Sequence, residues 1–339
     1  MDRTKLMETA NEIVADGKGI LAADESTPTI GKRFEGIGAE NSEENRCEYR
    51  GLLFTTDGLE EFISGVIMYD ETIRQSTSNG GEPFPKLLSD KGVLPGIKVD
   101  TGAKPLAGHD GEKVTEGLDD LRDRLSEYHN LGARFAKWRA VITIAEGIPT
   151  RACLEVNAHA LARYAALCQE AGIVPIVEPE VLMNGDHSID RCFEETEETL
   201  SVVFHELFKQ GVMLEGMILK PNMVISALGC PKQASVVEVA EATLECFLRV
   251  VPSAVPGICF LSGGQSDLIA TQHLNAMNAM DDSFPWKLSF SYGRALQSAA
   301  LKTWGGKTEN IPVAQKAFYH RAKCNGAATL GQYSDEMKN

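Results

Sequence analysis

The sequence predicts an α/β fold in which residues 1–339 form a single (β/α)8 barrel, with an N-terminal helix and a short C-terminal tail. Apolar, often β-branched runs recur along the whole chain, segments with helical periodicity separate them, and no low-complexity linker divides them. The predicted strands cover residues 19–24, 64–70, 94–98, 133–141, 174–181, 213–224, 257–262 and 286–291. Eight strand–helix units in a row favour a closed parallel barrel. An open doubly wound sheet is the alternative, because spacing alone does not prove closure.

The segments between the strands carry their own signals. Residues 1–17 mix charged and apolar side chains, which predicts a surface helix rather than a signal peptide. Residues 76–85 are rich in glycine, asparagine and serine and predict a long loop. The clearest helix is predicted at 155–172, where apolar residues form one stripe and Gly172 ends it as a C-cap would.

Composition limits the classes of function. The chain is 43% apolar and 24% charged, which suits a globular protein with a large core. A formal net charge of −15 argues against non-specific binding to nucleic acid or to an anionic membrane. A protein this acidic must concentrate positive charge locally to hold a phosphorylated substrate. No apolar stretch approaches membrane-spanning length, and without a targeting segment we expect a cytoplasmic protein.

Cysteine and histidine do not suggest a metal site. The eight cysteines contain no Cys-x-x-Cys pair, and we expect them to be free, mostly buried thiols. The seven histidines contain no His-x-His or His-x-x-x-His pair. We therefore predict that the protein holds no metal, although distant positions remain available to assemble one.

Charged residues interrupt the predicted strands near their ends, where buried parallel strands are normally apolar. Residues two apart share a face of a strand, so Lys137 points with Arg139 and Glu178 points with Glu180. Burying such charges is costly unless they pair or take part in chemistry. In a barrel, the C-terminal strand ends converge on one site, which predicts that these residues meet.

Lys220 is the candidate nucleophile. It ends the apolar run 217–219, where loss of water and neighbouring cations would disfavour the ammonium form. A neutral amine is the species that attacks a ketone. The alternative is a structural lysine whose amine reaches solvent, which is the commoner case for a single lysine.

Glu178 and Glu180 suit either metal binding or acid–base chemistry. No histidine stands near them in sequence, and lysines are the expected neighbours, so acid–base work is favoured. A structural ion-pair network with Lys137 and Lys220 is the alternative for one of the two.

Two glycine-containing segments predict a phosphate site. Ser262, Gly263 and Gly264 follow the seventh predicted strand, and Ser291, Gly293 and Arg294 follow the eighth. In barrels, the loops after these strands commonly bind phosphate, because glycines let backbone N–H groups approach and arginine adds a bidentate cation. Taken alone, Ser-Gly-Gly is more often a plain turn.

The first loop adds a second group of polar residues. Asp24 is followed by Ser26, Thr29 and Arg33. Ser26 is suited equally to a helix N-cap and to ligand contact. Two basic clusters, Arg294 with the glycines and Lys98 with Arg33, predict a substrate with two separate anionic groups.

These residues lie within motifs that resemble class I (Schiff-base) fructose-bisphosphate aldolases of the eukaryotic type over nearly the whole chain. The matching stretches are 17–26, 96–100, 135–139, 172–180, 219–224, 260–266, 290–296, 304–307 and 321–322. The resemblance implies a TIM barrel and a cytoplasmic, usually homotetrameric lyase of glycolysis and gluconeogenesis. The implied reaction is reversible cleavage of fructose 1,6-bisphosphate to dihydroxyacetone phosphate and glyceraldehyde 3-phosphate, without metal or cofactor.

The resemblance also implies roles for single residues. Lys220 matches the Schiff-base lysine, Glu178 the general acid/base and Asp24 the carboxylate beside the C4 hydroxyl. Lys137 and Arg139 match cations near the reacting carbons. The matched substrate contacts are Ser262, Gly263, Gly264, Gly293 and Arg294 at one phosphate, Ser26, Lys98 and Arg33 toward the other end of the sugar, and Ser291. Thr29 replaces the serine of many relatives but keeps the hydroxyl.

The C-terminal residues depart from the family pattern. Relatives carry a mobile tail that ends in a tyrosine serving proton transfer at the enamine carbon, and Tyr333 lies where that tail begins. We therefore do not equate the two tyrosines, and we expect slow enamine reprotonation in the 339-residue chain.

Two rival functions remain at this point. One is another Schiff-base barrel, such as a transaldolase or deoxyribose-phosphate aldolase, against which two phosphate sites argue. The other is a scaffold for cytoskeletal or membrane partners. An intact Lys/Glu/Asp set argues against loss of catalysis, though both roles can coexist.

Overall fold

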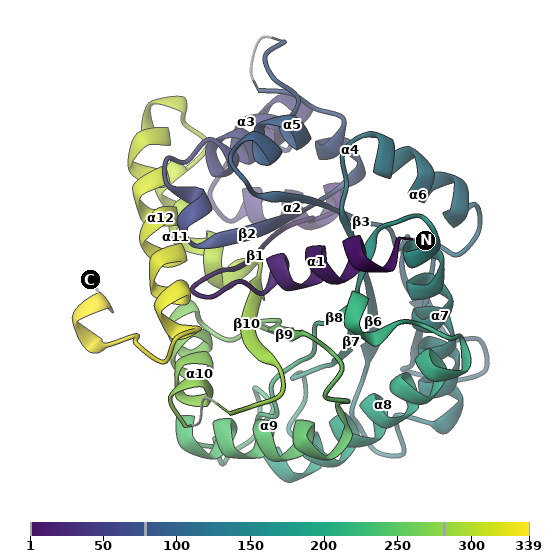
Figure 1. The fold of residues 1–339 in the computed structure, drawn as a ribbon. Coiled ribbons are helices and arrows are strands. Elements are labelled where there is room, and N and C mark those ends of the chain that lie inside the picture. Colours follow the sequence, from purple (N-terminus) through teal and green to yellow (C-terminus); the bar gives the residue numbers. More distant parts are fainter. Residues whose placement is uncertain (1, 78–79, 281–282, 339) are drawn as a thin grey trace.

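A computed structural model of the chain describes residues 2–77, 80–280 and 283–338. Eight parallel strands close into a barrel and follow one another around it in chain order, as predicted (Figure 1). The barrel strands are β1 (Gly19–Ala23), β2 (Ile63–Met68), β3 (Leu94–Lys98), β6 (Phe135–Ile142), β7 (Val174–Val181), β8 (Ile218–Leu219), β9 (Gly257–Phe260) and β10 (Lys287–Tyr292). Pairing of β10 with β1 completes the ring, with Ser291 opposite Ile20.

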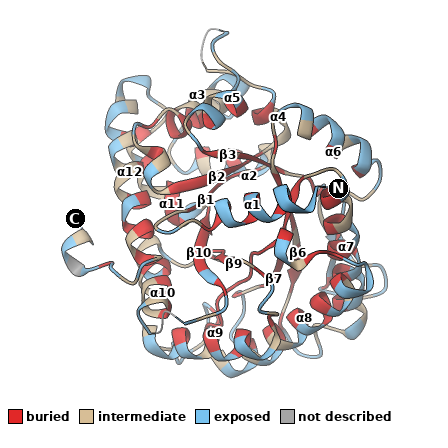
Figure 2. Cartoon of the chain, in the orientation of Figure 1, coloured by how far each residue is buried: buried red, intermediate tan, exposed pale blue. Residues whose placement is uncertain are grey.

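Helices surround the barrel. Figure 2 shows buried residues along the strands and on the inward sides of the helices, and exposed residues outside. The helices are α1 (Arg3–Ile13), α2 (Thr27–Glu35), α3 (Glu43–Phe54), α4 (Asp70–Ile73), α5 (Phe84–Asp90), α6 (Leu121–Asn130), α7 (Arg151–Glu170), α8 (Ile189–Lys209), α9 (Val236–Val250), α10 (Asp267–Met280), α11 (Arg294–Trp304) and α12 (Ile311–Ala328). Single 3-10 turns cover Leu59–Glu61, Leu214–Gly216, Thr308–Asn310 and Asp335–Lys338.

Local sequence explains where the outer helices begin and end. Thr150 caps α7 by accepting a hydrogen bond from the Cys153 N–H, and α9 begins with a capping box formed by Ser235 and Glu238. Gly172 follows α7 with φ of 75°, a left-handed conformation that favours glycine. The helix predicted at 155–172 is therefore present but begins one turn earlier.

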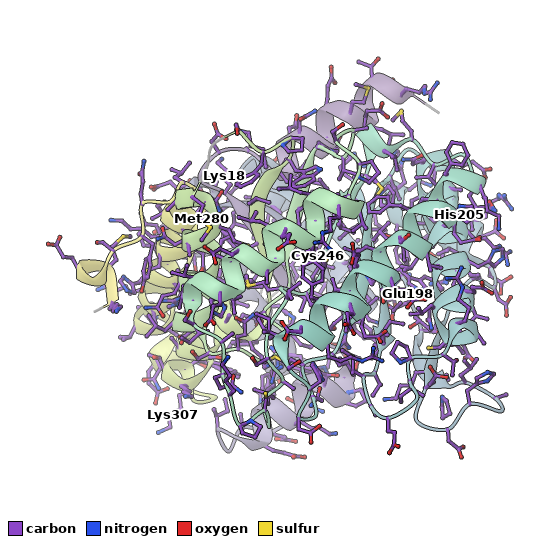
Figure 3. All side chains as sticks on the ribbon, turned by 90° about the horizontal axis from the view of Figure 1, so that it is seen from below. Lys18, Glu198, His205, Cys246, Met280 and Lys307 are labelled. Carbon is purple, nitrogen blue, oxygen red and sulfur yellow. The ribbon has the colours of Figure 1, made fainter. Side chains whose placement is uncertain are left out.

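The outer layer is continuous around the barrel. Seen from below, α8 carries Glu198 and His205 beside α9, which carries Cys246 (Figure 3). Arg249 of α9 lies 3.5 Å from Glu197 of α8 and links the two helices at the surface.

Cys246 is one of six buried cysteines, while Cys47 and Cys230 are partly exposed, and all eight are free. The expected free, mostly buried thiols are confirmed.

The N-terminal helix has a structural role that the sequence did not reveal. Figure 1 shows α1 lying across the barrel axis. Its buried face, Leu6, Ala10 and Ile13, packs in one apolar cluster with barrel residues that include Phe135 and Ile218. The helix therefore closes the N-terminal mouth of the barrel with one face and exposes the other to solvent.

Two segments differ from the predicted strands. A two-stranded antiparallel hairpin, β4 (Gly102–Pro105) and β5 (Lys113–Glu116), follows β3 and was not predicted. The run at 213–224 was predicted as one strand, yet only Ile218–Leu219 is a strand. Proline lacks a backbone N–H, and both Pro221 and the neighbouring Pro179 interrupt the pattern of strand hydrogen bonds there. The predicted loop at 76–85 includes residues 78–79, which lie outside the described residues; Ser76 bridges Pro83 across it.

Candidate active site

The polar residues predicted at the strand ends meet in one cavity of about 540 Å³ at the C-terminal end of the barrel. Every residue predicted for the site lines this cavity except Gly264. Gly264 lies just behind it, where a Cβ atom would stand 3.3 Å from the Arg294 guanidinium. Convergence at this end of the barrel follows from the parallel strands, because each strand delivers its C-terminal residue to the same edge.

Lys220 lies in a chain of alternating charges at the centre of the cavity. Its Nζ is 3.3 Å from Oε1 of Glu178, whose Oε2 is 3.5 Å from Nζ of Lys137. Lys137 Nζ in turn lies 2.8 Å from Oδ2 of Asp24. Lys220, Lys137 and Glu178 are buried and Asp24 is largely so. The site therefore holds two amines and two carboxylates that line the cavity, each 2.8–3.5 Å from the next.

These charges fix each other's ionisation. Burial alone would raise the pKa of Asp24, but the nearby Lys137 and Lys220 outweigh it and hold that pKa well below the ordinary 3.8. Burial alone would lower the pKa of Lys137, yet the carboxylates of Asp24, Glu178 and Asp100 raise it well above its usual range. Asp24 is thus an anion and Lys137 a cation at neutral pH.

The second glutamate of β7 has a different environment. Glu180 forms a close ion pair with Arg139 of β6, and both line the cavity. Burial opposes the charge of Arg139, but Glu180 and Glu178 raise the pKa of the guanidinium above its usual range. Glu178 faces the lysines while Glu180 is held by an arginine. The ion pairs with Lys137 and Lys220 considered for one of the two glutamates are therefore made by Glu178, while Glu180 pairs with Arg139 instead.

Asp100 belongs to the site and was missed by the sequence reasoning. Its Oδ1 lies 2.7 Å from Nζ of Lys98, and its Oδ2 lies 4.0 Å from Nζ of Lys137. Oδ2 also accepts a hydrogen bond from the backbone N–H of Arg139 at 3.3 Å. The available signal was its spacing: Asp100 stands two residues after Lys98, on the same face of an extended chain.

The glycine-containing segments form one wall of the cavity. Gly263 and Gly264 have φ of 58° and 99°, left-handed values that bulkier residues rarely adopt. Gly293 is the N-cap of α11, so Arg294 stands in its first turn, where backbone N–H groups and the helix dipole favour an anion. The hydroxyl of Ser291 is buried and has no hydrogen-bond partner among the described residues. This wall is suited to phosphate.

The first loop presents two hydroxyls to the cavity, those of Ser26 and Thr29. Ser26 is the N-cap residue of α2 but forms no side-chain cap hydrogen bond; its Oγ lies 3.0 Å from Oγ1 of Thr29. Ligand contact is therefore favoured over the capping alternative. Arg33 was grouped with Lys98, but its guanidinium lies near Gly293, 3.8 Å from where a Cβ would stand. Lys98 is instead bound to Asp100.

A buried network holds Arg33. Glu25 pairs closely with Arg33, and its Oε2 lies 2.6 Å from the buried guanidinium of Arg50. Gln297 donates to Oε1 of Glu25 at 3.1 Å and to the backbone carbonyl of Ala22 at 2.7 Å. Glu25, Arg50 and Gln297 were not predicted as site residues. Only Glu25 had a signal, its place directly after Asp24, since Arg50 and Gln297 lie on outer helices.

Comparison with known proteins agrees with this arrangement. The family model described as "Fructose-bisphosphate aldolase class-I" matches residues 5–339. The chain belongs to this family. It is a carbon–carbon lyase of glycolysis that cleaves fructose 1,6-bisphosphate reversibly and therefore takes a sugar phosphate as substrate.

Individual relatives support the same assignment. The chain is 60% identical to a probable fructose-bisphosphate aldolase class 1 of Xanthomonas campestris over 98% of this chain and 99% of that one. It is 54% identical to fructose-bisphosphate aldolase 5, cytosolic, of Arabidopsis thaliana, over 97% and 92% of the two chains. An aldolase structure from Plasmodium falciparum, in complex with TRAP and a small molecule inhibitor, superposes with a TM-score of 0.96. That protein is 49% identical, and the match covers 98% of this chain and 95% of that one.

Two polar residues outside the predicted site lie away from the cavity. Asp70, the polar residue after β2, is half exposed and binds Arg74 and Tyr128 instead. Tyr333 is buried, does not line the cavity, and donates its backbone N–H to Asn275 of α10. Within the described residues no group of three or more metal-ligating side chains gathers, and no helix there is long and apolar enough to cross a membrane.

Proposed function

We propose that Lys220 is the Schiff-base nucleophile of this aldolase, assisted by Glu178, Asp24 and Lys137. The observation that carries the proposal is the 3.3 Å separation of Lys220 Nζ from Glu178 Oε1, with both side chains buried. An amine that must lose protons and a carboxylate that accepts them stand within transfer distance, away from bulk water.

The first half of the reaction forms the imine. The amine of Lys220 adds to the C2 carbonyl of the open-chain sugar and gives a carbinolamine. Glu178 donates a proton to the departing C2 hydroxyl, which leaves as water. The resulting iminium withdraws electrons from the neighbouring carbon–carbon bonds and serves as the electron sink.

The second half breaks the C3–C4 bond. A carboxylate, Asp24 or Glu178, accepts the proton of the C4 hydroxyl while the electrons of the C3–C4 bond move into the iminium and form an enamine. Glyceraldehyde 3-phosphate leaves. A proton returned to C3 regenerates the iminium, and water hydrolyses it to dihydroxyacetone phosphate. Lys137 stays protonated between Asp24 and Glu178 and stabilises negative charge that develops at the C4 oxygen.

The remaining site residues bind the substrate in this proposal. One phosphate is held by the wall that contains Ser262, Gly263, Gly264, Gly293 and Arg294. Ser26, Thr29 and Lys98 contact the sugar toward its other end, and Ser291 contacts it as well. Arg33, whose guanidinium lies near Gly293, adds a cation beside the phosphate wall. Arg139 with Glu180 lies near the reacting carbons. Two anionic groups on one substrate fit the several cations that line the cavity of this acidic protein.

Borohydride reduction in the presence of dihydroxyacetone phosphate tests the nucleophile. We expect irreversible inactivation and a reduced adduct at Lys220 in peptide mass mapping. An otherwise identical incubation without borohydride should leave the enzyme active. An adduct at Lys98 or Lys137 instead of Lys220 would show that the nucleophile is misassigned.

We further propose that residues 1–339 act as one barrel domain with an N-terminal helix and a C-terminal tail, in the cytoplasm, as a homotetramer without metal or cofactor. The resemblance to the family supports the tetramer, and the cytosolic Arabidopsis relative supports the location. The charge of −15 supports the absence of nucleic-acid and membrane partners. Sedimentation of the purified protein tests the tetramer, since a monomer mass at micromolar concentration would overturn it.

A further inference from the structure

The strand that presents Lys220 is the shortest in the barrel. Only Ile218 and Leu219 are in regular strand conformation, paired with Ile176 and Val177 of β7. The residue proposed to do the chemistry therefore lies just beyond the end of regular pairing. Something other than the strand ladder must fix its distance from the carboxylates of β7.

The next backbone hydrogen bond between the Lys220 segment and β7 is missing because a proline occupies the donor position. The N–H of Lys220 donates to the carbonyl of Val177 at 2.8 Å. In a parallel pair, the following bond returns from residue 179 of β7 to the carbonyl of Lys220. Residue 179 is proline and has no N–H to give. On the other side, Leu261 still donates to the carbonyl of Pro221 at 3.0 Å, so the segment stays attached to β9.

Asn222 replaces the lost connection to β7 with its side chain. Its Oδ1 accepts the N–H of Val181 at 2.9 Å, a bond that a regular ladder would give to the backbone carbonyl of residue 222. Its Nδ2 donates to Oγ1 of Thr196 on α8 at 3.0 Å and to the carbonyl of Met223 at 3.1 Å. Asn222, Val181 and Thr196 are all buried, so water does not compete for these bonds.

The bridge joins the two elements that carry the reacting groups. Asn222 is two residues after Lys220, and Val181 directly follows Glu180 and lies three residues after Glu178. The hydrogen bond from the Val181 N–H to Asn222 Oδ1 sets the spacing of these two segments beyond the point where regular backbone pairing ends. The 3.3 Å approach of Lys220 Nζ to Glu178 Oε1 depends on that spacing.

We propose that Asn222 is a positioning residue for Schiff-base formation: its side-chain amide bridges the gap left by Pro179 and holds Lys220 in reach of Glu178. This inference rests on the proposed role of Lys220. Asn222 does not line the cavity and so has no part in binding the sugar phosphate.

The test separates positioning from binding. Asn222→Leu removes all three side-chain hydrogen bonds at similar volume. We expect the single-turnover rate of imine formation with dihydroxyacetone phosphate, trapped by borohydride, to fall about ten- to a hundredfold, as for a small misplacement of a reacting group. The Kd for a hexitol 1,6-bisphosphate, which has no carbonyl and forms no imine, should stay within about twofold of wild type, a factor that corresponds to little binding energy.

Thr196→Val is the matched control. It removes the anchor on α8 but keeps the bond from Val181 to Asn222, so we expect imine formation to slow far less than in Asn222→Leu. If Asn222→Leu does not fold, Asn222→Ala, which leaves space for water, takes its place in the comparison.

Three results would overturn the inference: a wild-type rate of imine formation in the folded Asn222 variant, an equal loss in Thr196→Val, or a parallel loss of rate and of hexitol bisphosphate binding. Failure of the wild-type enzyme to label Lys220 would instead overturn the proposed nucleophile. The two proposals therefore fail by different measurements.

Discussion

The ammonium of Lys137 lies 2.8 Å from the carboxylate of Asp24. The two side chains come from separate parts of the sequence, Asp24 directly after β1 and Lys137 from β6, and both line the cavity. Their pairing keeps one negative and one positive charge side by side where the C4 hydroxyl of the substrate must lose its proton.

Replacing Lys137 with methionine should slow catalysis much more than it weakens binding. The change removes the cation between Asp24 and Glu178, so charge that develops at the C4 oxygen loses its partner. We expect kcat for the bisphosphate to fall by about 10²–10⁴, the range typical of a positioned catalytic group. Lys287→Met is the matched control, because that lysine pairs with Asp16 at the other end of the barrel. An unchanged kcat in Lys137→Met would remove Lys137 from the mechanism.

Asp24 should make stability depend on pH in the acid range. Its pKa in the folded state is lower than the ordinary 3.8, so its charge stabilises the fold above about pH 4. That contribution is lost as pH falls through the lowered pKa. In urea unfolding across this range, wild type should exceed Asp24→Asn in stability near neutral pH, and the difference should shrink as the pH drops below about 4. A difference that stays constant with pH would contradict the assignment.

Arg294→Ala should weaken binding of both fructose 1,6-bisphosphate and fructose 1-phosphate. Loss of a charge-assisted contact to phosphate costs roughly 1.5–3 kcal/mol, which is about ten- to a hundredfold in Kd. Arg122→Ala serves as control, since that arginine is exposed and pairs with Glu170. Equal affinities of Arg294→Ala and wild type, measured by calorimetry, would place the phosphate elsewhere.

Arg50→Met should destabilise the protein without removing a substrate contact. Arg50 is buried against Glu25 and does not line the cavity. Removing one member of a buried ion pair leaves the other uncompensated and typically costs about 3–5 kcal/mol. Arg74→Ala breaks exposed pairs with Asp70 and Glu127 and should cost less than about 1 kcal/mol. Urea unfolding compares the two variants. Similar losses in the free energy of unfolding would show that the buried Arg50–Glu25 pair stabilises the fold no more than an exposed pair does.

Activity should survive strong chelators. In the proposed mechanism the iminium at Lys220 supplies the electron sink, so no Lewis acid is needed to polarise the carbonyl. Prolonged dialysis against EDTA should leave kcat unchanged. Loss of activity that zinc restores would point to metal-assisted chemistry and contradict the imine.

Most of the fold could be predicted from the recurring apolar runs, because a buried parallel strand needs a continuous apolar run. All eight predicted strands occur, and polar residues at their ends lie where the barrel brings them together. The failures also have physical causes. The 213–224 run is apolar enough for a strand, but Pro179, remote in sequence, removes the partner donor. The β4–β5 hairpin lacks an apolar face and leaves little signal.

Site residues were predictable where they stood on strands and hard to predict where they act from the helices. Lys220 and Glu178 interrupt apolar runs, which marks them as unusual. Arg50 and Gln297 stand in helices whose polar residues normally face solvent, and only the folded chain shows that they turn inward to Glu25. Exposure of a helical residue depends on which face meets the barrel, and a single sequence indicates that face only approximately.

Closure of the ring between β1 and β10 has a consequence for how the chain is made. Lys18 near the N-terminus accepts a hydrogen bond from Ser289, 271 residues later. During synthesis on the ribosome, β1 has a free edge until β10 has emerged, and non-local closure of this kind is slow. An unpaired strand edge is a template for association with other chains. We therefore expect the growing aldolase chain to expose this strand edge to other chains until its last strand is translated.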